Sequence, residues 1–234
     1  MVTPRERARE RTMAEIRELA WRQVEEFGAA SLSLRAIARD LGVVSSAIYR
    51  YVPSRDDLLT ALLVDGFSDL AEAVEAAEVA VPPQEYRERW LTIARSMRAW
   101  ALERPAAWGL LYGGPVPGYY APQQETSPPG TRVLLRHGSV LMEALAAGKL
   151  DPRVGPAGGF EDIPDDLRSV VDGLASGYGV QAPAEVVVTG FLGWTSLLGV
   201  ISAEVFEQFG PEATKVTSLM VDVQLESIAD ALGL

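Results

Sequence analysis

Apolar residues recur at helical spacing along nearly the whole chain. The first run consists of Met13, Ile16, Ala20, Val24 and Phe27, at steps of three or four residues, and a glycine ends it. Similar runs predict further helices over about 54–77, 84–103, 105–112, 131–147, 165–178, 184–209 and 212–232. The intervening stretches 113–130 and 148–163 are rich in proline and glycine, which predicts loops. Because no stretch shows convincing two-residue alternation, we expect an all-α fold.

Residues 33–59 differ from the rest because three apolar periods follow one another closely. Ser33 is a good N-cap for a short helix that Gly42 ends, and another short helix is expected over about 45–51. Ser54 and Asp57 then form a capping box that opens the long helix. Two short helices joined by a turn with glycine predict a helix-turn-helix, whose second helix enters the major groove of DNA.

The second short helix has an apolar and a polar side. At 100° per residue, Val44, Ala47 and Ile48 point inward, whereas two serines, Tyr49 and Arg50 point outward. The inward placement of Val44 is an expectation from the helical wheel alone. Arginine reads guanine with two hydrogen bonds, and hydroxyl groups bind base edges or phosphates. The alternative interpretation is a compact helical subdomain with no DNA partner.

Charge is distributed unevenly between the two ends of the chain. The net charge is −11, which alone argues against nucleic acid. Residues 1–60 nevertheless hold ten arginines against nine acidic residues, whereas residues 61–234 hold 11 basic and 23 acidic residues. Only the N-terminal part is therefore suited to face a phosphate backbone. Four arginines between residues 5 and 11 form either an arm toward the minor groove or a solvated helix start.

The stretch Gly42-Val43 followed by "AIYRYVPSRDDLL" (47–59) resembles the signature of the TetR/AcrR family of bacterial regulators. Val44 departs from the pattern because the family usually has a serine or threonine cap there, a loss of about 1 kcal/mol unless Ser45 substitutes. The resemblance implies a double-stranded DNA operator as partner. It also implies a set of DNA-binding residues, which are Arg35, Ser45, Ser46, Tyr49, Arg50, Tyr51 and Arg55.

The stretches 101–122 and 193–210 are similar to the C-terminal domain of a subgroup of actinobacterial TetR regulators. We therefore expect a helix-turn-helix domain over 1–55 and a larger helical ligand-binding and dimerisation domain over 56–234. In the family, the last two helices of each subunit form a four-helix bundle with a second copy, and the alternative here is a monomer with a central apolar helix. The residues expected at the homodimer interface are Val170, Leu174, Gly190, Gly193, Trp194, Leu197 and Ile201.

An aromatic stripe runs along the predicted helix 84–103. Such a stripe is more typical of plain core than of a cavity, and His137, the single histidine, is more typical of a satisfied core residue than of a ligand contact. The resemblance implies a cavity for an unidentified, largely apolar inducer in this region. The candidate ligand contacts are Trp90, Ala94, Met97, Trp108, Tyr112 and His137.

Several kinds of chemistry have no support in the sequence. There is no cysteine, and one histidine without a helical Glu-x-x-His pair predicts neither a metal site nor a catalytic triad. No glycine-rich phosphate loop precedes a helix. We therefore expect no enzyme and no cofactor.

One segment meets the lower length limit for a membrane span, since residues 186–203 carry no charge. Hydroxyl residues interrupt this segment and acidic residues flank it, which favours a buried helix and no membrane partner. The charged N-terminus favours the cytoplasm. The predicted function is a dimeric, ligand-responsive regulator, most simply a repressor. The alternative is a helical small-molecule-binding or adaptor protein that has lost DNA binding.

Overall fold

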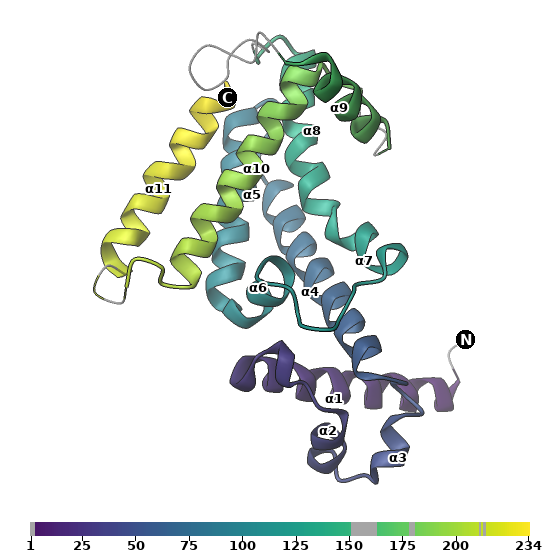
Figure 1. Ribbon diagram of the computed structural model, residues 1–234. Helices are drawn as coiled ribbons and strands as arrows, with labels where there is room; N and C mark the ends of the chain where they lie inside the picture. Colours follow the sequence, from purple (N-terminus) through teal and green to yellow (C-terminus); the bar gives the residue numbers. More distant parts are fainter. Residues whose placement is uncertain (1–2, 151–162, 178–180, 211, 213) are drawn as a thin grey trace. The chain divides into compact units, whose positions relative to one another are not determined.

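The computed structural model describes residues 3–150, 163–177, 181–210, 212 and 214–234, and every regular element in them is a helix (Figure 1). The all-α fold predicted from the periodicity is confirmed. Two compact units make up the chain: an N-terminal unit of residues 1–69 and 103–130, and a C-terminal unit of residues 70–102 and 131–234. Helix α4 (Arg55–Glu78) contributes to both. The predicted division at residue 55 concerns functional domains and remains a prediction.

The N-terminal unit is built on α1 (Pro4–Phe27), against which α2 (Leu34–Asp40) and α3 (Ser45–Ile48) lie (Figure 1). Ile16, Ile37 and Ile48 are completely buried, together with leucines at the start of α4, so each short helix buries one apolar residue or more in a shared core. The unit also contains η1 (Ala29–Ser31), α6 (Pro105–Tyr112) and α7 (Gln123–Gly130).

Two local features differ from the sequence-based expectations, and a third decides between two alternatives that the sequence left open. Helix α7 lies inside the predicted loop 113–130, where Pro128 and Pro129 near its end hid the helical pattern. Helix α3 is regular only as far as Ile48, and turns continue to residue 51. The arginines between residues 5 and 11 belong to α1, which a capping box of Thr3 and Glu6 starts, so they do not form an extended arm.

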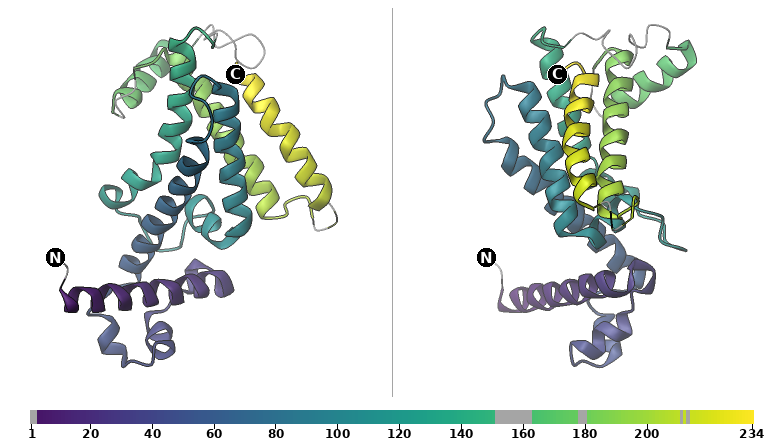
Figure 2. Two further views of the ribbon diagram at one scale, coloured as in Figure 1. Left: turned by 180° about the vertical axis from the view of Figure 1, so that it is seen from behind. Right: turned by 90° about the vertical axis from the view of Figure 1, so that its left-hand side faces the viewer.

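The C-terminal unit is a bundle of the end of α4 with α5 (Tyr86–Glu103), α8 (Arg132–Ala146), α9 (Asp165–Gly177), α10 (Ala184–Val205) and α11 (Thr214–Ala231). Helices α10 and α11 run side by side in every view (Figures 1 and 2). Helix α10 is long and apolar enough to cross a membrane, but it packs against α8, α9 and α11. These contacts within the bundle favour a core helix over a membrane span, in agreement with the expectation from the flanking acidic residues.

Candidate functional site

The turn between α2 and α3 sets the direction of the short helix α3. Gly42 has a φ of +74°, a left-handed conformation that glycine adopts without strain. The Ser33 hydroxyl caps α2 by accepting a hydrogen bond from the Ala36 amide at 3.4 Å. Val44 occupies the N-cap of α3 and makes no side-chain capping bond. The expected loss of a cap is therefore present in the structure.

Helix α3 and the turn after it present the predicted polar sector to solvent. Ile48 is completely buried, which fixes the orientation of the helix. Ser45, Ser46, Tyr49 and Arg50 are exposed, and the Tyr49 residue is 45 % accessible. Two hydroxyls, a phenol and a guanidinium thus lie on one surface, a set of groups that can reach base edges and phosphates.

The other predicted DNA contacts lie in different surroundings. Arg35 is exposed on α2. Tyr51 is half-buried against the N-terminal core, and the Arg9 guanidinium lies 5.4 Å from the centre of its ring. Arg9 also donates to the Arg50 carbonyl oxygen at 3.3 Å. Arg9 therefore supports the end of the reading surface from α1, a role that the sequence gave no means of finding.

Arg55 has structural partners of its own. Its Nη2 donates to the carbonyl oxygens of Ala29 and Ala30, each at 3.1 Å, and its Nη1 lies 3.6 Å from a carboxylate oxygen of Asp56. These bonds tie the start of α4 to η1. The resemblance implies that Arg55 contacts a DNA phosphate, and these bonds give it a bracing role within the N-terminal unit as well.

The predicted ligand residues lie in two separate places. Trp90, Ala94 and Met97 are completely buried in the C-terminal unit, and none of them lines a described pocket. The core interpretation of the aromatic stripe is the one that fits this burial. Trp108 and Tyr112 belong to the N-terminal unit, where their ring centres lie 4.6 Å apart. Burial raises the pKa of the Tyr112 hydroxyl, which keeps it neutral.

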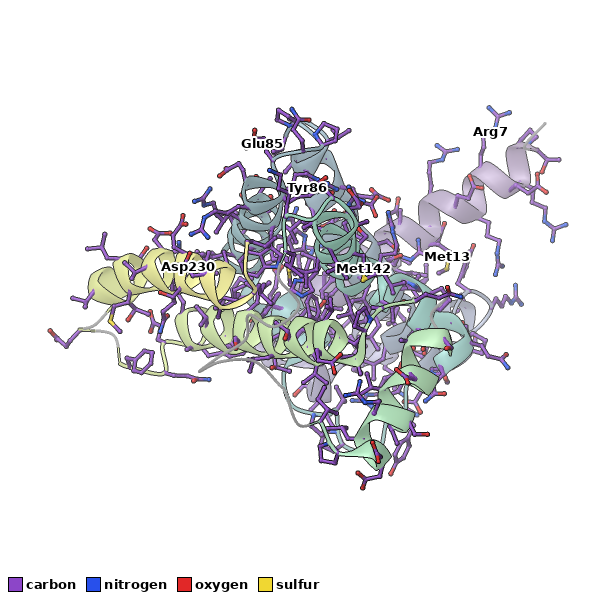
Figure 3. All side chains as sticks on the ribbon, turned by 90° about the horizontal axis from the view of Figure 1, so that it is seen from above. Arg7, Met13, Glu85, Tyr86, Met142 and Asp230 are labelled. Atoms are coloured by element: carbon purple, nitrogen blue, oxygen red, sulfur yellow. The ribbon has the colours of Figure 1, made fainter. Side chains whose placement is uncertain are left out.

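A pocket of about 460 Å³ lies in the C-terminal unit between α8, α9 and α10. Met142, on α8 in the view of Figure 3, is one of its lining residues. Only His137 among the predicted ligand residues lines it. The others are Leu134, Leu135, Gly138, Ser139, Leu141, Met142, Glu143, Ala175, Gln181, Ala182, Val186, Val187, Gly190 and Phe191. The wall is mostly apolar, as expected of a site for a largely apolar molecule.

His137 is held at the inner side of this pocket by two hydrogen bonds. The Trp90 indole Nε1–H donates to His137 Nδ1 at 2.8 Å, so His137 Nε2 carries the proton and donates to the Gly190 carbonyl oxygen at 3.0 Å. Burial lowers the pKa of His137 to about 4, against a smaller opposing effect of the Gly190 hydrogen bond. His137 is thus a satisfied, neutral histidine that also borders the pocket.

This histidine predicts a pH dependence of folding. Its pKa is about 4 in the folded chain and 6.5 as the reference value, so unfolding takes up a proton between these values. Stability is fully present above the unfolded pKa and falls by about 3 kcal/mol as the pH drops to about 4. Urea unfolding across this pH range measures the loss. The His137→Gln variant, which does not titrate, should lack this part of the slope, and an unchanged slope would contradict the assignment.

The residues expected at a dimer interface are mostly inside the protomer. Gly190, Gly193, Trp194, Leu197 and Ile201 are buried on the face of α10 that packs within the bundle. A Cβ at Gly193 would lie 2.8 Å from Leu232 Cδ2 of the same chain. The protomer's own helices cover these five residues, so the sequence-based choice of face has no support from their burial and stays a prediction.

Two residues predicted on α9 complete that set. Val170 is exposed, whereas the side chain of Leu174 lies outside the part of the chain that the structure describes. The exposed side of α10 and α11 carries a further apolar band. We call it the α10–α11 face; it consists of Leu192, Phe206, Val216, Leu219, Met220 and Val223. An exposed apolar band of this kind marks an interaction surface.

Known proteins resemble the chain over its whole length. Residues 16–62 match the model of bacterial regulatory proteins of the tetR family, and residues 90–227 match that of the tetracyclin repressor-like C-terminal domain. The chain is 42 % identical over 233 residues to the HTH-type transcriptional regulator Rv1816 of Mycobacterium tuberculosis, covering 99 % of this chain and 97 % of that protein.

Solved structures agree with these matches. The regulatory protein SCO4313 is 30 % identical, with a TM-score of 0.75 and coverage of 97 % of this chain and 98 % of that one. RolR in complex with resorcinol is 17 % identical, with a TM-score of 0.51 and coverage of 95 % of both chains, which is a likeness of fold alone.

Proposed function

Because the chain belongs to the TetR family of bacterial regulators, we propose that it is a dimeric repressor that binds a palindromic operator and is released by a small-molecule inducer. Members of this family are transcriptional regulators with a helix-turn-helix DNA-binding domain, not enzymes. The observation that carries the proposal is the exposed sector of α3, and a cytoplasmic location follows from the role.

Operator reading rests on the exposed side chains of α3. In this proposal, Tyr49 and Arg50 contact base edges, Ser45 and Ser46 contact bases or phosphates, and Arg35 contacts a phosphate. Since the chain contains no asparagine and residues 33–59 contain no glutamine, the usual bidentate amide contact to adenine is absent from this surface. Specificity then depends on arginine, on apolar contacts and on the shape of the DNA.

Dimerisation is assigned to the α10–α11 face. A palindrome requires two recognition helices about 34 Å apart, which one chain cannot supply. A symmetric dimer would place the exposed apolar residues of these neighbouring helices against the same residues of a second copy, and Val170 on α9 is a separate candidate contact. The face carries leucine, valine, methionine and phenylalanine side chains, so a second copy would bury them from water.

The inducer is assigned to the pocket between α8, α9 and α10. Its apolar wall supports a largely apolar ligand, and the distantly similar RolR has been crystallised with resorcinol, a small aromatic molecule. Helix α4 has Arg55 at its first residue and continues into the C-terminal unit, so it is the candidate link between ligand and DNA. The inducer acts by its differential affinity for two conformations, and operator DNA must weaken inducer binding by the same factor, about 5–150-fold.

Binding to DNA from the protein's own promoter region tests the regulator against the alternative of a helical protein that has lost DNA binding. We expect a palindrome to be bound far more tightly than random DNA, with an affinity that falls steeply as salt rises. Titrations at several salt concentrations measure both the preference for the palindrome and the salt dependence of the affinity. Equal, weak binding to the palindrome and to random DNA would favour the alternative.

A further inference from the structure

We propose that the pocket between α8, α9 and α10 takes an uncharged, largely apolar molecule with one hydrogen-bond donor, and that Glu143 accepts this hydrogen bond. The inference rests on the ligand response proposed above and names the class of ligand. It also identifies the residues through which the ligand reaches the end of α4. Three observations carry it: the charges around the pocket, an acceptor at its rim, and the ion pairs that this acceptor shares.

The described wall of the pocket contains no lysine or arginine. His137 borders it, but this ring is neutral and both of its nitrogens are already hydrogen-bonded. Glu143 is the only charged residue in the wall, and it pairs with Arg89. An anionic ligand would therefore enter an apolar site without a counter-charge, which is strongly unfavourable. A cationic ligand would gain little, because arginine already balances the Glu143 carboxylate.

Glu143 has one carboxylate oxygen committed and one available. Its Oε2 accepts a hydrogen bond from Arg89 Nη1 at 2.6 Å. The nearest donor recorded for Oε1 is Arg136 Nη1 at 3.8 Å, which is beyond hydrogen-bond distance. Among the described residues, Oε1 therefore has no hydrogen-bond donor, and because the Glu143 side chain is 44 % exposed, water reaches this oxygen until a ligand donor replaces it. A ligand with one N–H or O–H group can satisfy this oxygen while its apolar body occupies the pocket.

The same carboxylate belongs to a cluster that holds the last residue of α4. Arg89 Nε donates to Glu78 Oε1 at 2.8 Å, and Arg136 donates to both carboxylate oxygens of Glu78. Glu78 is only 3 % exposed. Burial raises its pKa, but hydrogen bonds from Arg136 and Arg89 outweigh this and keep the pKa below its usual value, so it stays charged.

Arg89 thus bridges the pocket and α4, because it donates to Glu143 on one side and to Glu78 on the other. It also donates to the Pro83 carbonyl oxygen at 2.8 Å, just after α4 ends. A ligand donor at Glu143 weakens the negative potential that holds Arg89 toward the pocket. The strength of the Arg89–Glu78 ion pair changes as a result, so ligand binding alters the contacts of the last residue of α4.

Two fluorescent probes that share one aromatic skeleton and differ by a sulfonate group test the ligand class. N-phenyl-1-naphthylamine is uncharged, apolar and has a single N–H donor, and 8-anilinonaphthalene-1-sulfonate is its sulfonated analogue. We expect the neutral probe to bind about tenfold or more tightly than the sulfonate in fluorescence titrations of the full chain. Equal or tighter binding of the sulfonate would overturn the proposed charge selectivity.

A pair of glycine substitutions locates the probe. A Cβ at Gly138 would meet no heavy atom within 4 Å and Gly138 lines the pocket, so Gly138→Leu is the substitution chosen to fill part of it. Gly114 lines a different hollow of about 470 Å³ in the N-terminal unit, and a Cβ there is equally unobstructed. We expect Gly138→Leu to weaken the neutral probe about tenfold and Gly114→Leu to leave it unchanged. The reverse result would place the site elsewhere, and thermal melts verify that both variants are folded.

A probe without the donor tests the role of Glu143. In 1-phenoxynaphthalene, an ether oxygen replaces the N–H group, and its affinity is measured by displacement of the fluorescent amine. The wild type should prefer the amine about tenfold, and Glu143→Met, which keeps the length but not the acceptor, should lose this preference. A merely structural effect would weaken both probes equally and would overturn the assignment. None of these titrations contains DNA, so their failure would leave operator binding, and with it the rest of the proposed function, intact.

Discussion

Placing arginine at both Leu219 and Val223 is expected to yield a folded monomer that no longer holds its operator. These residues are 70 % and 67 % exposed on α11, so the substitutions disturb no packing within the protomer. In a dimer joined through the α10–α11 face, they would bury two uncompensated charges on each protomer, four in all, at a cost of several kcal/mol. Sedimentation should show the monomer, and operator affinity should fall about a hundredfold or more because the two half-sites are no longer bound together.

A matched variant separates this effect from a general change of charge. Ala73→Arg with Val79→Arg adds the same charge at exposed positions on α4 and just after it, away from the α10–α11 face. This control should sediment as the wild type does. If the Leu219/Val223 variant also stays dimeric, the interface lies elsewhere. Gly193→Glu should instead unfold the chain, because it places an unpaired carboxylate in a buried position against Leu232.

The sequence did not distinguish the buried face of α10 from its exposed face. The sequence predicted the helix because a long uncharged stretch in a helical protein forms a helix that is covered on most sides. The same lack of charge left no polar side to mark the outside. Gly193 and Trp194 were therefore placed at the interface, although they face α11 and the bundle core. Only the packing of neighbouring helices distinguishes the two faces.

The DNA-reading surface was predictable because it is local. Ile48 must be buried in so short a helix, and this fixes the exposure of Tyr49 and Arg50 within the next turn. Contacts between distant segments were not predictable in this way. Arg55 bonds to the Ala29 and Ala30 carbonyl oxygens, and a sequence cannot distinguish such a bond from a phosphate contact.

The pocket that we propose as the ligand site was the hardest part to predict, for a related reason. Trp90, Ala94 and Met97 fill the core, because a stripe of large side chains packs without leaving space. The pocket instead lies where small residues such as Gly138 and Gly190 face one another across α8 and α10. Neither helix shows this by itself, since a cavity is a property of the pair.

The double variant Tyr49→Ala, Arg50→Ala is expected to abolish specific operator binding while the fold remains intact. Both side chains are exposed, so their removal costs no core packing. Each good contact to a base edge contributes about 1–3 kcal/mol of discrimination, and the two together correspond to about 30-fold to 10⁴-fold in specific affinity. Titration of operator and random DNA with each variant measures the change. Undiminished operator affinity in the double variant would remove the proposed reading surface.

The variant Arg55→Ala is the control for the Tyr49/Arg50 variant, because it removes the proposed phosphate contact and not a base contact. A phosphate contact carries no base sequence, so this variant should weaken operator and random DNA by the same factor. It also removes two hydrogen bonds from a charged donor to η1, which should lower the free energy of unfolding by about 1–3 kcal/mol. We expect the Tyr49/Arg50 variant to lose its preference for the operator and keep its free energy of unfolding. We expect Arg55→Ala to keep the preference and lose stability. This difference would distinguish base reading from bracing of the N-terminal unit. If Arg55→Ala weakened only operator binding and left the free energy of unfolding unchanged, Arg55 would be a base-reading residue and not a brace.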